Sequence, residues 1–441
     1  MNRPLLLHSI TPGLVTLVAL FAALTLSLTE TNAQNNDTQS PFTRFGIGTP
    51  SKPSTHATKG MGSLGLAVRD ASLINPMNPA SYTAADSLTF IFDFGFHTSL
   101  SVLEEGNDRF AGMQGNISYI SLLFPFNKYA AFSAGLKPFS SVGYTYAVSA
   151  PVENAPQSTY TSSYNGSGNI NSVYAGLSVQ PVEAWSVGIN GEFLFGTITH
   201  NRVVAFDETL TDAYNPAFND RLQLRGWSLT AGTQAQIPLK DDNALIIGAT
   251  YTPRLPFSSV AMRHNTISRS GVPATTILAD TVRSRSSFYT PDTYGLGIGW
   301  KQGDRLYLGA DFYYNRWGKA FTDTAGAYNG ADQWQVALGM SLTPDARSSA
   351  YGRKIQYRWG LTAQSPSLKI RNQEGGYDGL YRAGVSLGLG LPLVDRRSYV
   401  DVALSYNRDI PTGALKVADN YLELSLSLRF NEAWFKKIRL E

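Results

Sequence analysis

The most regular pattern in the chain is an alternation of apolar and polar residues near its C-terminus. In YLELSLSLRF (421–430) every second residue from Leu422 to Phe430 is apolar, and the residues between them are polar or amphipathic. Because successive side chains of a β-strand point to opposite faces, this spacing predicts a strand with one apolar and one polar face. The runs at 381–391 and 398–406 repeat the pattern.

Similar runs recur from Ser87 onward and predict about fourteen strands. Residues 34–86 lack this period and are rich in Ser, Thr, Pro and Gly, so we expect them to form a separate N-terminal segment. We expect the strands near residues 87–103, 109–124, 129–149, 170–180, 185–201, 221–237, 244–260, 282–300, 305–316, 332–343, 355–368, 380–393, 398–409 and 420–430.

The connections between the runs alternate in length, with exceptions at 104–108 and 344–354. Short turns at one end and long loops at the other are typical of an outer-membrane barrel, whereas a soluble β-sandwich does not predict them. The tight turns are at 125–128, 181–184, 238–243, 301–304 and 394–397, and the long polar loops are near 150–169, 202–220, 261–281, 317–331, 369–379 and 410–419.

These patterns predict an all-β fold, a closed antiparallel transmembrane β-barrel of about 14 strands over residues 87–430. Closure is required because lipid offers no hydrogen-bond partner to an open strand edge. A barrel of this size has an interior too wide for side chains alone to fill, so water or another part of the chain must occupy it. We expect residues 431–441 to form a C-terminal tail at the periplasmic rim, or a frayed end.

The composition agrees with strands that have one wet face and one apolar face. Only 16% of the residues are charged, against about 25% in average globular chains. The net charge of +3 comes without a Lys/Arg cluster, so we expect no nucleic-acid partner. The absence of Cys excludes a disulfide scaffold, a Zn–Cys site and a lipid-modified N-terminal Cys.

The N-terminus predicts export. Arg3 precedes an apolar stretch from about Leu14 to Leu28, and TNA at 31–33 resembles a small-x-Ala cleavage site. A transmembrane helix is the alternative, but the stretch falls short of the roughly 18 apolar residues that such a helix needs. We therefore expect a cleaved signal peptide over residues 1–33 and a location in the outer membrane of a Gram-negative bacterium.

Candidate catalytic and cofactor sites are weak. GMGSLG (60–65) matches G-x-G-x-x-G, but no strand pattern precedes it, so it does not predict dinucleotide binding. The five His residues show no metal-ligand spacing, and H-E-x-x-H is absent. The one G-x-S-x-G match, GVSLG at 384–388, lies inside an alternating strand run and not at a strand-to-helix elbow. We expect a non-enzymatic protein without a cofactor or metal.

Charged residues of both signs fall on the polar, lumen-facing side of the predicted strands. Buried single charges are costly unless they are paired or wet. They therefore form either a structural ion-pair lattice across the lumen or a selective polar path. The residues are Glu192, Arg225, Asp311, Arg358, Arg382, Asp401, Glu423 and Arg429.

INPMNPASY (74–82) stands immediately before the first predicted strand. Pro76 and Pro79 lack a backbone N–H, and each biases the preceding Asn away from helix. We therefore expect this segment to stay out of helices and out of the first strand's ladder. We expect the side chains of Asn75 and Asn78 to make hydrogen bonds that hold the bend.

The segment 57–82 resembles the N-terminal hatch of the FadL-type outer-membrane barrel family. That family carries a Gly- and Ala-rich stretch, an acidic residue and an Asn-Pro-Ala element before its first strand. The resemblance implies a fourteen-stranded barrel whose lumen is occluded by a hatch over residues 34–86, and uptake of long-chain fatty acids or other hydrophobic compounds. The matching hatch positions are Gly60, Gly62, Gly65, Ala67, Asp70, Asn78, Pro79 and Ala80, with Asn75 and Pro76 in the same bend.

Two further stretches resemble one subgroup of that family. SPFTRFGIGTP (40–50) is similar to the start of these barrels, and WFKKIRLE (434–441) is similar to their short basic tail. The subgroup includes the plug protein of the type 9 secretion translocon, which closes the pore of a very large barrel. Many such barrels end on an aromatic residue, so we expect Tyr421, Leu428 and Phe430 to form the assembly signal of the last strand.

Two functions remain open from the sequence, besides an unspecialised porin. The first is an accessory or plug component of a type 9 translocon, with outer-membrane lipid and a very large barrel as partners. The second is a transporter with a hydrophobic small-molecule ligand. Resemblance in fold alone does not decide between them.

Overall fold

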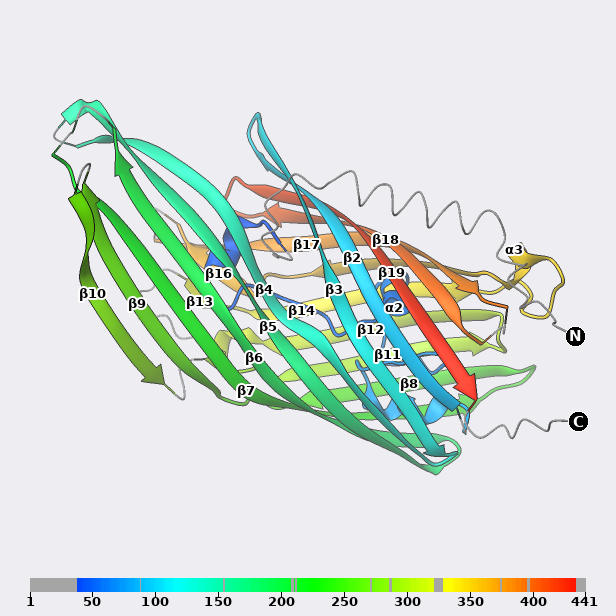
Figure 1. Ribbon diagram of the computed structural model, residues 1–441. Helices are drawn as coiled ribbons and strands as arrows, with labels where there is room; N and C mark the ends of the chain where they lie inside the picture. Colours follow the sequence, from blue (N-terminus) through cyan, green and yellow to red (C-terminus); the bar gives the residue numbers. More distant parts are fainter. Residues whose placement is uncertain are drawn as a thin grey trace, which may run out of the picture. The chain divides into compact units, whose positions relative to one another are not determined.

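The computed structural model describes residues 38–433 apart from 88, 154, 208–209, 211, 270–271, 285–287, 321–327, 373–374 and 395–396. Antiparallel strands follow one another around a barrel (Figure 1), and β19 pairs with β2 from Ala433↔Thr89 to Ala418↔Glu104, which closes it. The wall strands are β2 (Thr89–Glu105), β3 (Asp108–Asn127), β4 (Ala130–Val152), β5 (Ala155–Val182), β6 (Trp185–Phe206), β7 (Asn215–Pro238), β8 (Asn243–Thr252), β9 (Phe257–Arg269), β10 (Val272–Ser284), β11 (Thr293–Gln302), β12 (Leu306–Arg316), β14 (Asp332–Leu342), β15 (Gln356–Gln364), β17 (Tyr377–Pro392), β18 (Tyr399–Pro411) and β19 (Ala418–Ala433).

The predicted fold class, a closed antiparallel barrel with fourteen strand positions, is confirmed. The pair β8 and β9 fills one position, and the pair β10 and β11 fills another. The boundary expected at residue 430 falls inside β19. The remaining elements are η1 (Pro41–Arg44), β1 (Thr49–Pro50), α2 (His56–Lys59), η2 (Pro79–Ala84), η3 (Trp317–Lys319), β13 (Tyr328–Gly330), α3 (Tyr351–Lys354) and β16 (Leu368–Arg371).

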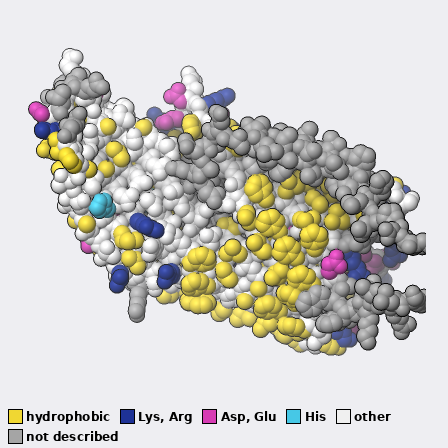
Figure 2. Space-filling view, in the orientation of Figure 1, with side chains coloured by type: hydrophobic (Ala, Val, Ile, Leu, Met, Phe, Trp, Pro, Cys, Tyr) yellow, Lys and Arg dark blue, Asp and Glu magenta, His cyan; other side chains and the backbone are white. Residues whose placement is uncertain are grey.

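The alternating sequence pattern sets which side chains face outward. In β17 and β18, Val385, Leu387 and Leu404 are exposed on the outer face, whereas Ser386 and Ser405 are buried on the inner face. Figure 2 shows the resulting apolar band, which covers the part of the wall nearer the short turns. A band of this kind is the lipid-facing surface of a membrane-spanning barrel.

Six wall strands stand above this band. We expected long loops near 150–169, 202–220 and 261–281, but most of these residues extend β4, β5, β6 and β7 or form β9 and β10. The register runs without interruption from Asn169↔Thr197 to Tyr160↔Phe206 between β5 and β6. This part of the wall stands outside lipid, so its outward positions need no apolar residues, and its Ser, Asn and Gly made it look like a loop.

Two predicted strands are broken. The run expected at 244–260 divides into β8 and β9 around Pro253 and Pro256. Proline removes a ladder hydrogen bond, which explains the break. β7 therefore pairs with β9 in its first half and with β8 in its second half, and the run expected at 282–300 divides in the same way between β10 and β11.

The wall has a gap between β3 and β4. Their ladder runs only from Asn127↔Ala130 to Ile120↔Leu136, although β3 continues to pair with β2 and β4 with β5 well beyond these residues. Figure 1 shows the two strands diverging toward the long-loop end. The short strand β1 pairs with Ser140 and Ser141 of β4 in this gap.

Residues 38–86, the described part of the predicted hatch, fold inside the barrel. From here on, the word hatch means residues 55–84 of this segment. Met61 and Leu64 pack in one buried cluster, and Ile74 and Tyr82 pack in another. Asn78 is extended, as expected, but the expectation that the bend avoids helix is wrong, because Pro79 begins the 3₁₀ helix η2. Proline suits the first turn of a helix, and the Asn78 side chain caps that turn by accepting from the Ala80 N–H.

Within the described residues, no helix combines the length and the apolarity needed to cross a membrane.

Candidate functional site

The hatch is fixed to the wall through its backbone. Gly65 and Leu66 donate their N–H groups to Asp311 Oδ2 on β12, at 2.7 and 2.9 Å. On another part of the wall, Arg429 Nη1 of β19 donates to the carbonyl of Ser72 at 2.8 Å. Because two separate strands hold the same short segment, these bonds fix the hatch to the wall at two places.

The two asparagines of the bend make the side-chain hydrogen bonds that we expected. Asn75 Nδ2 donates to the Gly65 carbonyl at 2.6 Å. Asn78 Nδ2 donates to the Leu66 carbonyl at 2.8 Å and to the Thr233 carbonyl on β7 at 3.1 Å. Asn78 therefore joins two turns of the hatch to each other and to the wall.

The glycines of GMGSLG have a packing role. A Cβ on Gly60 would lie 2.8 Å from Gly388 Cα, and one on Gly360 of β15 would lie 2.0 Å from Gly62 N. Gly62 has a φ of +73°, which strains any other residue. Glycine faces glycine, so the hatch backbone lies directly against the wall with no side chains between them.

The other predicted hatch residues lie in the same buried segment. Asp70 Oδ1 accepts from the N–H of Ser72 at 2.8 Å and shapes a local turn. The Pro76 carbonyl accepts from Asn190 Nδ2 on β6 at 3.0 Å. Pro79 fills the space beside the wall glycine Gly188.

Most of the predicted lumen charges meet in buried ion pairs. Arg358 Nη1 lies 2.6 Å from Asp401 Oδ1, and Arg429 Nη2 lies 3.2 Å from Asp401 Oδ2. These three side chains are nearly or wholly buried, so each charge needs its partner. The further inward pairs are Lys137–Glu192, Arg382–Asp409 and Lys59–Glu423.

Arg225 is placed differently from our expectation. Leu224 of β7 is buried in the lumen, so the neighbouring Arg225 points outward and is exposed. The assignment failed because β7 has passed above the apolar band at this point. There the inner face becomes apolar and the outer face polar, which reverses the usual pattern.

The three residues that we predicted to form the assembly signal of the last strand lie on two different faces of β19. Leu428 and Phe430 belong to the outward face of β19. Tyr421 faces inward, where the Arg382 guanidinium lies 5.0 Å from the centre of its ring.

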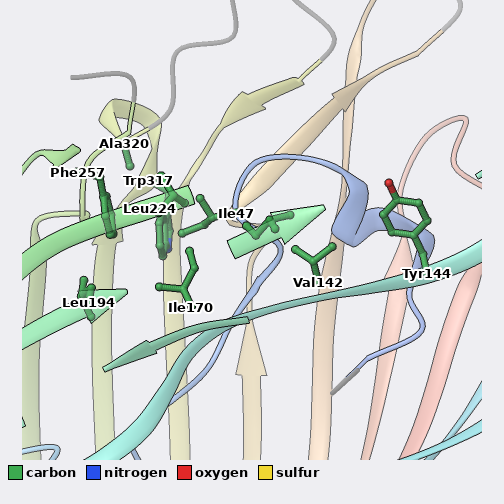
Figure 3. Packing of buried hydrophobic residues seen from close by; sticks show 10 residues of the cluster. Ile47, Val142, Tyr144, Ile170, Leu194, Leu224, Phe257, Trp317 and Ala320 are labelled. Carbon is green, nitrogen blue, oxygen red and sulfur yellow. The ribbon is translucent and has the colours of Figure 1, made fainter. Parts of the chain in front are cut away.

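An apolar cluster lies nearer the long-loop end (Figure 3). Ile47 of the N-terminal segment packs against Val142 and Ile170 of the tall wall, and Trp317 of η3 closes the cluster. Between this cluster and the hatch lies a cavity of about 500 Å³ whose lining is rich in Ser, Thr, Asn and Gln. The hatch thus closes the lumen below this space, and the apolar cluster covers one part of the wall above it.

The N-terminal segment also fills the gap between β3 and β4. Ser51 donates its N–H to the Phe139 carbonyl at 2.9 Å, and Thr43 Oγ1 donates to the Gly143 carbonyl at 3.1 Å. On the other side of the gap, Gln39 lies against Gly112 of β3. These contacts satisfy edge groups of β4 that would otherwise be unpaired.

Sequence reasoning missed the buried partners of His56. Its backbone N–H donates to Tyr119 OH at 3.0 Å, and Tyr119 OH donates to Asp93 Oδ1 at 3.1 Å. Burial, together with the nearby Lys59 ammonium, lowers the pKa of His56 to about 3. Asp93 stands between two Phe in FDF, so its inward position was visible in the alternation. In the described part of the chain, no group of three His, Asp or Glu side chains could hold a metal ion.

The comparisons with known proteins agree with this architecture. A model of the family described as BamG matches residues 16–441. A FadL homologue of Pseudomonas aeruginosa is similar in structure, with a TM-score of 0.61 at 13% identity over 87% of this chain and 99% of that one. The Pseudomonas putida toluene transporter TodX gives 0.60 at 13% identity over 88% and 99%.

The Ralstonia pickettii toluene transporter TbuX gives a TM-score of 0.55 at 13% identity over 85% of this chain and 97% of that one. No curated protein matches the sequence. At these identities the likeness shows the fold, which is that of FadL-type channel and transporter barrels. The likeness in fold does not distinguish solute passage from protein binding, so this question is argued below from the residues of the lumen.

Proposed function

The chain belongs to the BamG family, and we propose that it is a non-enzymatic accessory barrel of the outer membrane that acts by binding another protein. In this proposal no solute crosses its lumen. The observation that carries it is the direct docking of the hatch backbone on the wall. Glycines face each other at Gly60 and Gly388, and Asp311 and Arg429 hold the hatch from two separate strands.

The energy of this docking supports a permanently closed lumen. Leaving a buried polar group unpaired costs about 1–3 kcal/mol, and more for a charged group. Opening a path would break the bonds at Asp311, Asn78 and Arg429 together. A ligand that binds weakly cannot offset this sum, so the barrel supports a binding role better than a transport role.

The narrower role, closure of a type 9 translocon pore, stays a prediction. It depends on the resemblance of residues 40–50 and of the C-terminal tail to the plug subgroup. Residues 40–50 lie in the gap between β3 and β4, where they contact Gly143 and Ser141. A partner that approaches this side of the barrel would meet them.

Transport of hydrophobic compounds is the second candidate, and the gap between β3 and β4 favours it. A gap in the wall could pass an apolar compound sideways into lipid. The cavity beside the gap argues against this, because hydroxyl groups and ion pairs solvate an alkyl chain poorly.

Affinity purification of the tagged protein from native membranes tests the proposal. We expect stoichiometric recovery of another outer-membrane protein, and recovery of a very large barrel would support the narrower plug role. A deletion strain should take up fatty acids and toluene at the normal rate. A protein purified alone, together with uptake that is lost on deletion and restored by complementation, would contradict the proposal in favour of transport.

A further inference from the structure

The cavity inside the barrel, whose lining combines polar and apolar side chains, has the form of a binding site. Its volume of about 500 Å³ lies in the range of small-molecule sites, about 300–1,000 Å³. Gly62 and Ser63 of the hatch form its floor. Its lining continues to Ser367 and Leu368 at the long-loop end, so it reaches the side from which a ligand outside the cell would enter.

Neighbouring strands contribute neutral hydrogen-bonding groups to this cavity in continuous rows. Hydroxyl and amide groups can both donate and accept, so the rows suit a ligand that also carries both functions. The ladder places Thr362 of β15 and Asn407 of β18 opposite the same residue, Gly384, and Asn407 opposite Tyr421. A second row contains the neutral residues Ser386, Ser405, Ser99 and Gln114. Glu423 stands between Ser405 and Ser99 in this row and is paired with Lys59.

Part of this hydrogen-bonding capacity is unused. Among the described residues, the side chains of Thr362, Gln364 and Asn407 have no protein hydrogen-bond partner, and all three are half-buried on the cavity wall. A Cβ on Gly384 would lie 2.2 Å from Asn407 Oδ1 and 2.7 Å from Thr362 Oγ1, so the glycine makes space for these two side chains on the cavity wall. Groups of this kind are available to a ligand without breaking any bond within the protein.

The charges of the lining cancel. Three pairs, Lys59–Glu423, Lys137–Glu192 and Arg382–Asp409, are formed within the wall and hatch. The remaining charged residues of the lining are Lys52 and Asp419, one of each sign. The cavity therefore offers no net charge to an ion. Apolar side chains also contribute to its lining, but an alkyl chain in this space would leave the hydroxyl and amide groups without a hydrogen-bond partner.

We propose that this cavity binds a short neutral oligosaccharide. Such a ligand supplies many hydroxyl groups for the free amides. Its apolar ring faces can pack on aromatic side chains of the lining, which include Phe139, Trp317 and Tyr421. The site lies within one chain, so this binding does not depend on the partner protein proposed above.

Single-cysteine variants test this site directly, because the protein contains no Cys. In T362C a charged, membrane-impermeant thiol reagent labels the cavity wall of the detergent-purified barrel. The control is S349C, which carries its cysteine on an exposed loop. Both variants are first checked for heat-modifiable migration on a denaturing gel, so that only folded barrels are compared.

We expect maltotriose, chitotriose or xylotriose to slow labelling of T362C in a saturable way, by about tenfold at ten times its Kd, and to leave S349C unchanged. Removing one amide in Q364A or N407A should raise that Kd about fivefold. Protection by laurate in place of a saccharide would overturn the proposal in favour of a hydrophobic ligand. Equal labelling with and without every trisaccharide would overturn it as well, and the cavity would then hold only water.

Discussion

The buried histidine of the hatch makes its docking sensitive to acid. His56 is almost fully buried, its Nε2 lies 2.9 Å from Ser118 Oγ, and its pKa is about 3. A free histidine titrates near 6.5. His56 therefore binds a proton below about pH 6.5 when the hatch is released, but only near pH 3 when the hatch is docked. Docking of the hatch weakens as the pH falls from about 6.5 to about 3.

We predict that limited proteolysis of the hatch accelerates several-fold between pH 7 and pH 4. H56Q should largely remove this pH dependence, because glutamine can keep the bond to Ser118 and does not titrate. H264Q, on the exposed face of β9, is the control and should behave like the natural protein. A pH dependence that H56Q leaves intact would refute the role of this residue.

Asp311 is the strongest single anchor of the hatch. In D311A two buried N–H donors, those of Gly65 and Leu66, lose their acceptor. We predict that hatch docking weakens by about 2–5 kcal/mol, measured as faster proteolysis at pH 7. The exposed Asp304, which pairs only with Lys301 three residues away, provides the control D304A. Equal proteolysis of the two variants would contradict the assignment.

Among the elements, β15 provides a sharp test of backbone-on-backbone packing. In G360A the new methyl group would lie 2.0 Å from Gly62 N, so the hatch must move. Gly191 of β6 is a matched position, because its nearest atom would be 4.0 Å from the added Cβ. We predict that G360A exposes the hatch to protease at least about tenfold more than G191A, and that both variants still assemble as barrels. Equal protection would show that the contact is loose.

The sequence predicted the membrane part of the wall well and the rest less well. In β17, β18 and β19 apolar residues alternate with polar ones because the outer face of the wall contacts lipid and the inner face contacts water or polar groups. Above the apolar band this contrast vanishes, so β5 appeared to begin at 170 although it begins at Ala155. The gap between β3 and β4 depends on pairing across the wall, and alternation within one strand carries no such signal.

The candidate site followed the same division. The bend at Asn75 and Asn78 was predictable, because proline and asparagine act locally. The partners of the wall charges were not predictable, because Arg358, Asp401 and Arg429 meet only when three strands are in register. Arg225 was assigned to the wrong face of the wall. At its height β7 lies above the apolar band, where the polar residues face outward.

For the whole molecule, the buried charges act as cross-links of the closed wall. Asp401 is shared by Arg358 and Arg429, and D401N would leave both without a full partner. We predict a loss of about 3–5 kcal/mol of stability, seen as a lower temperature for the heat-modifiable gel shift. D220N removes the exposed pair with Arg263 and should change stability by about 0–1 kcal/mol. Similar losses in both variants would argue against a buried lattice.

The barrel is thus closed by the hatch, and the cluster around Ile47 packs the N-terminal segment against the tall wall above it. A lumen closed by the hatch suits a protein whose working surface is its wall and rim. It also leaves a space above the hatch, which a saccharide could fill without displacing the hatch.

Conductance across a planar bilayer tests the closed lumen most directly. The purified natural protein should insert without forming an open channel, whereas G360A should give measurable conductance once its hatch is displaced. G191A should stay closed and excludes an effect of substitution alone. A steady ion current through the natural protein would contradict the sealed lumen, and with it the proposal that this barrel works by binding a partner.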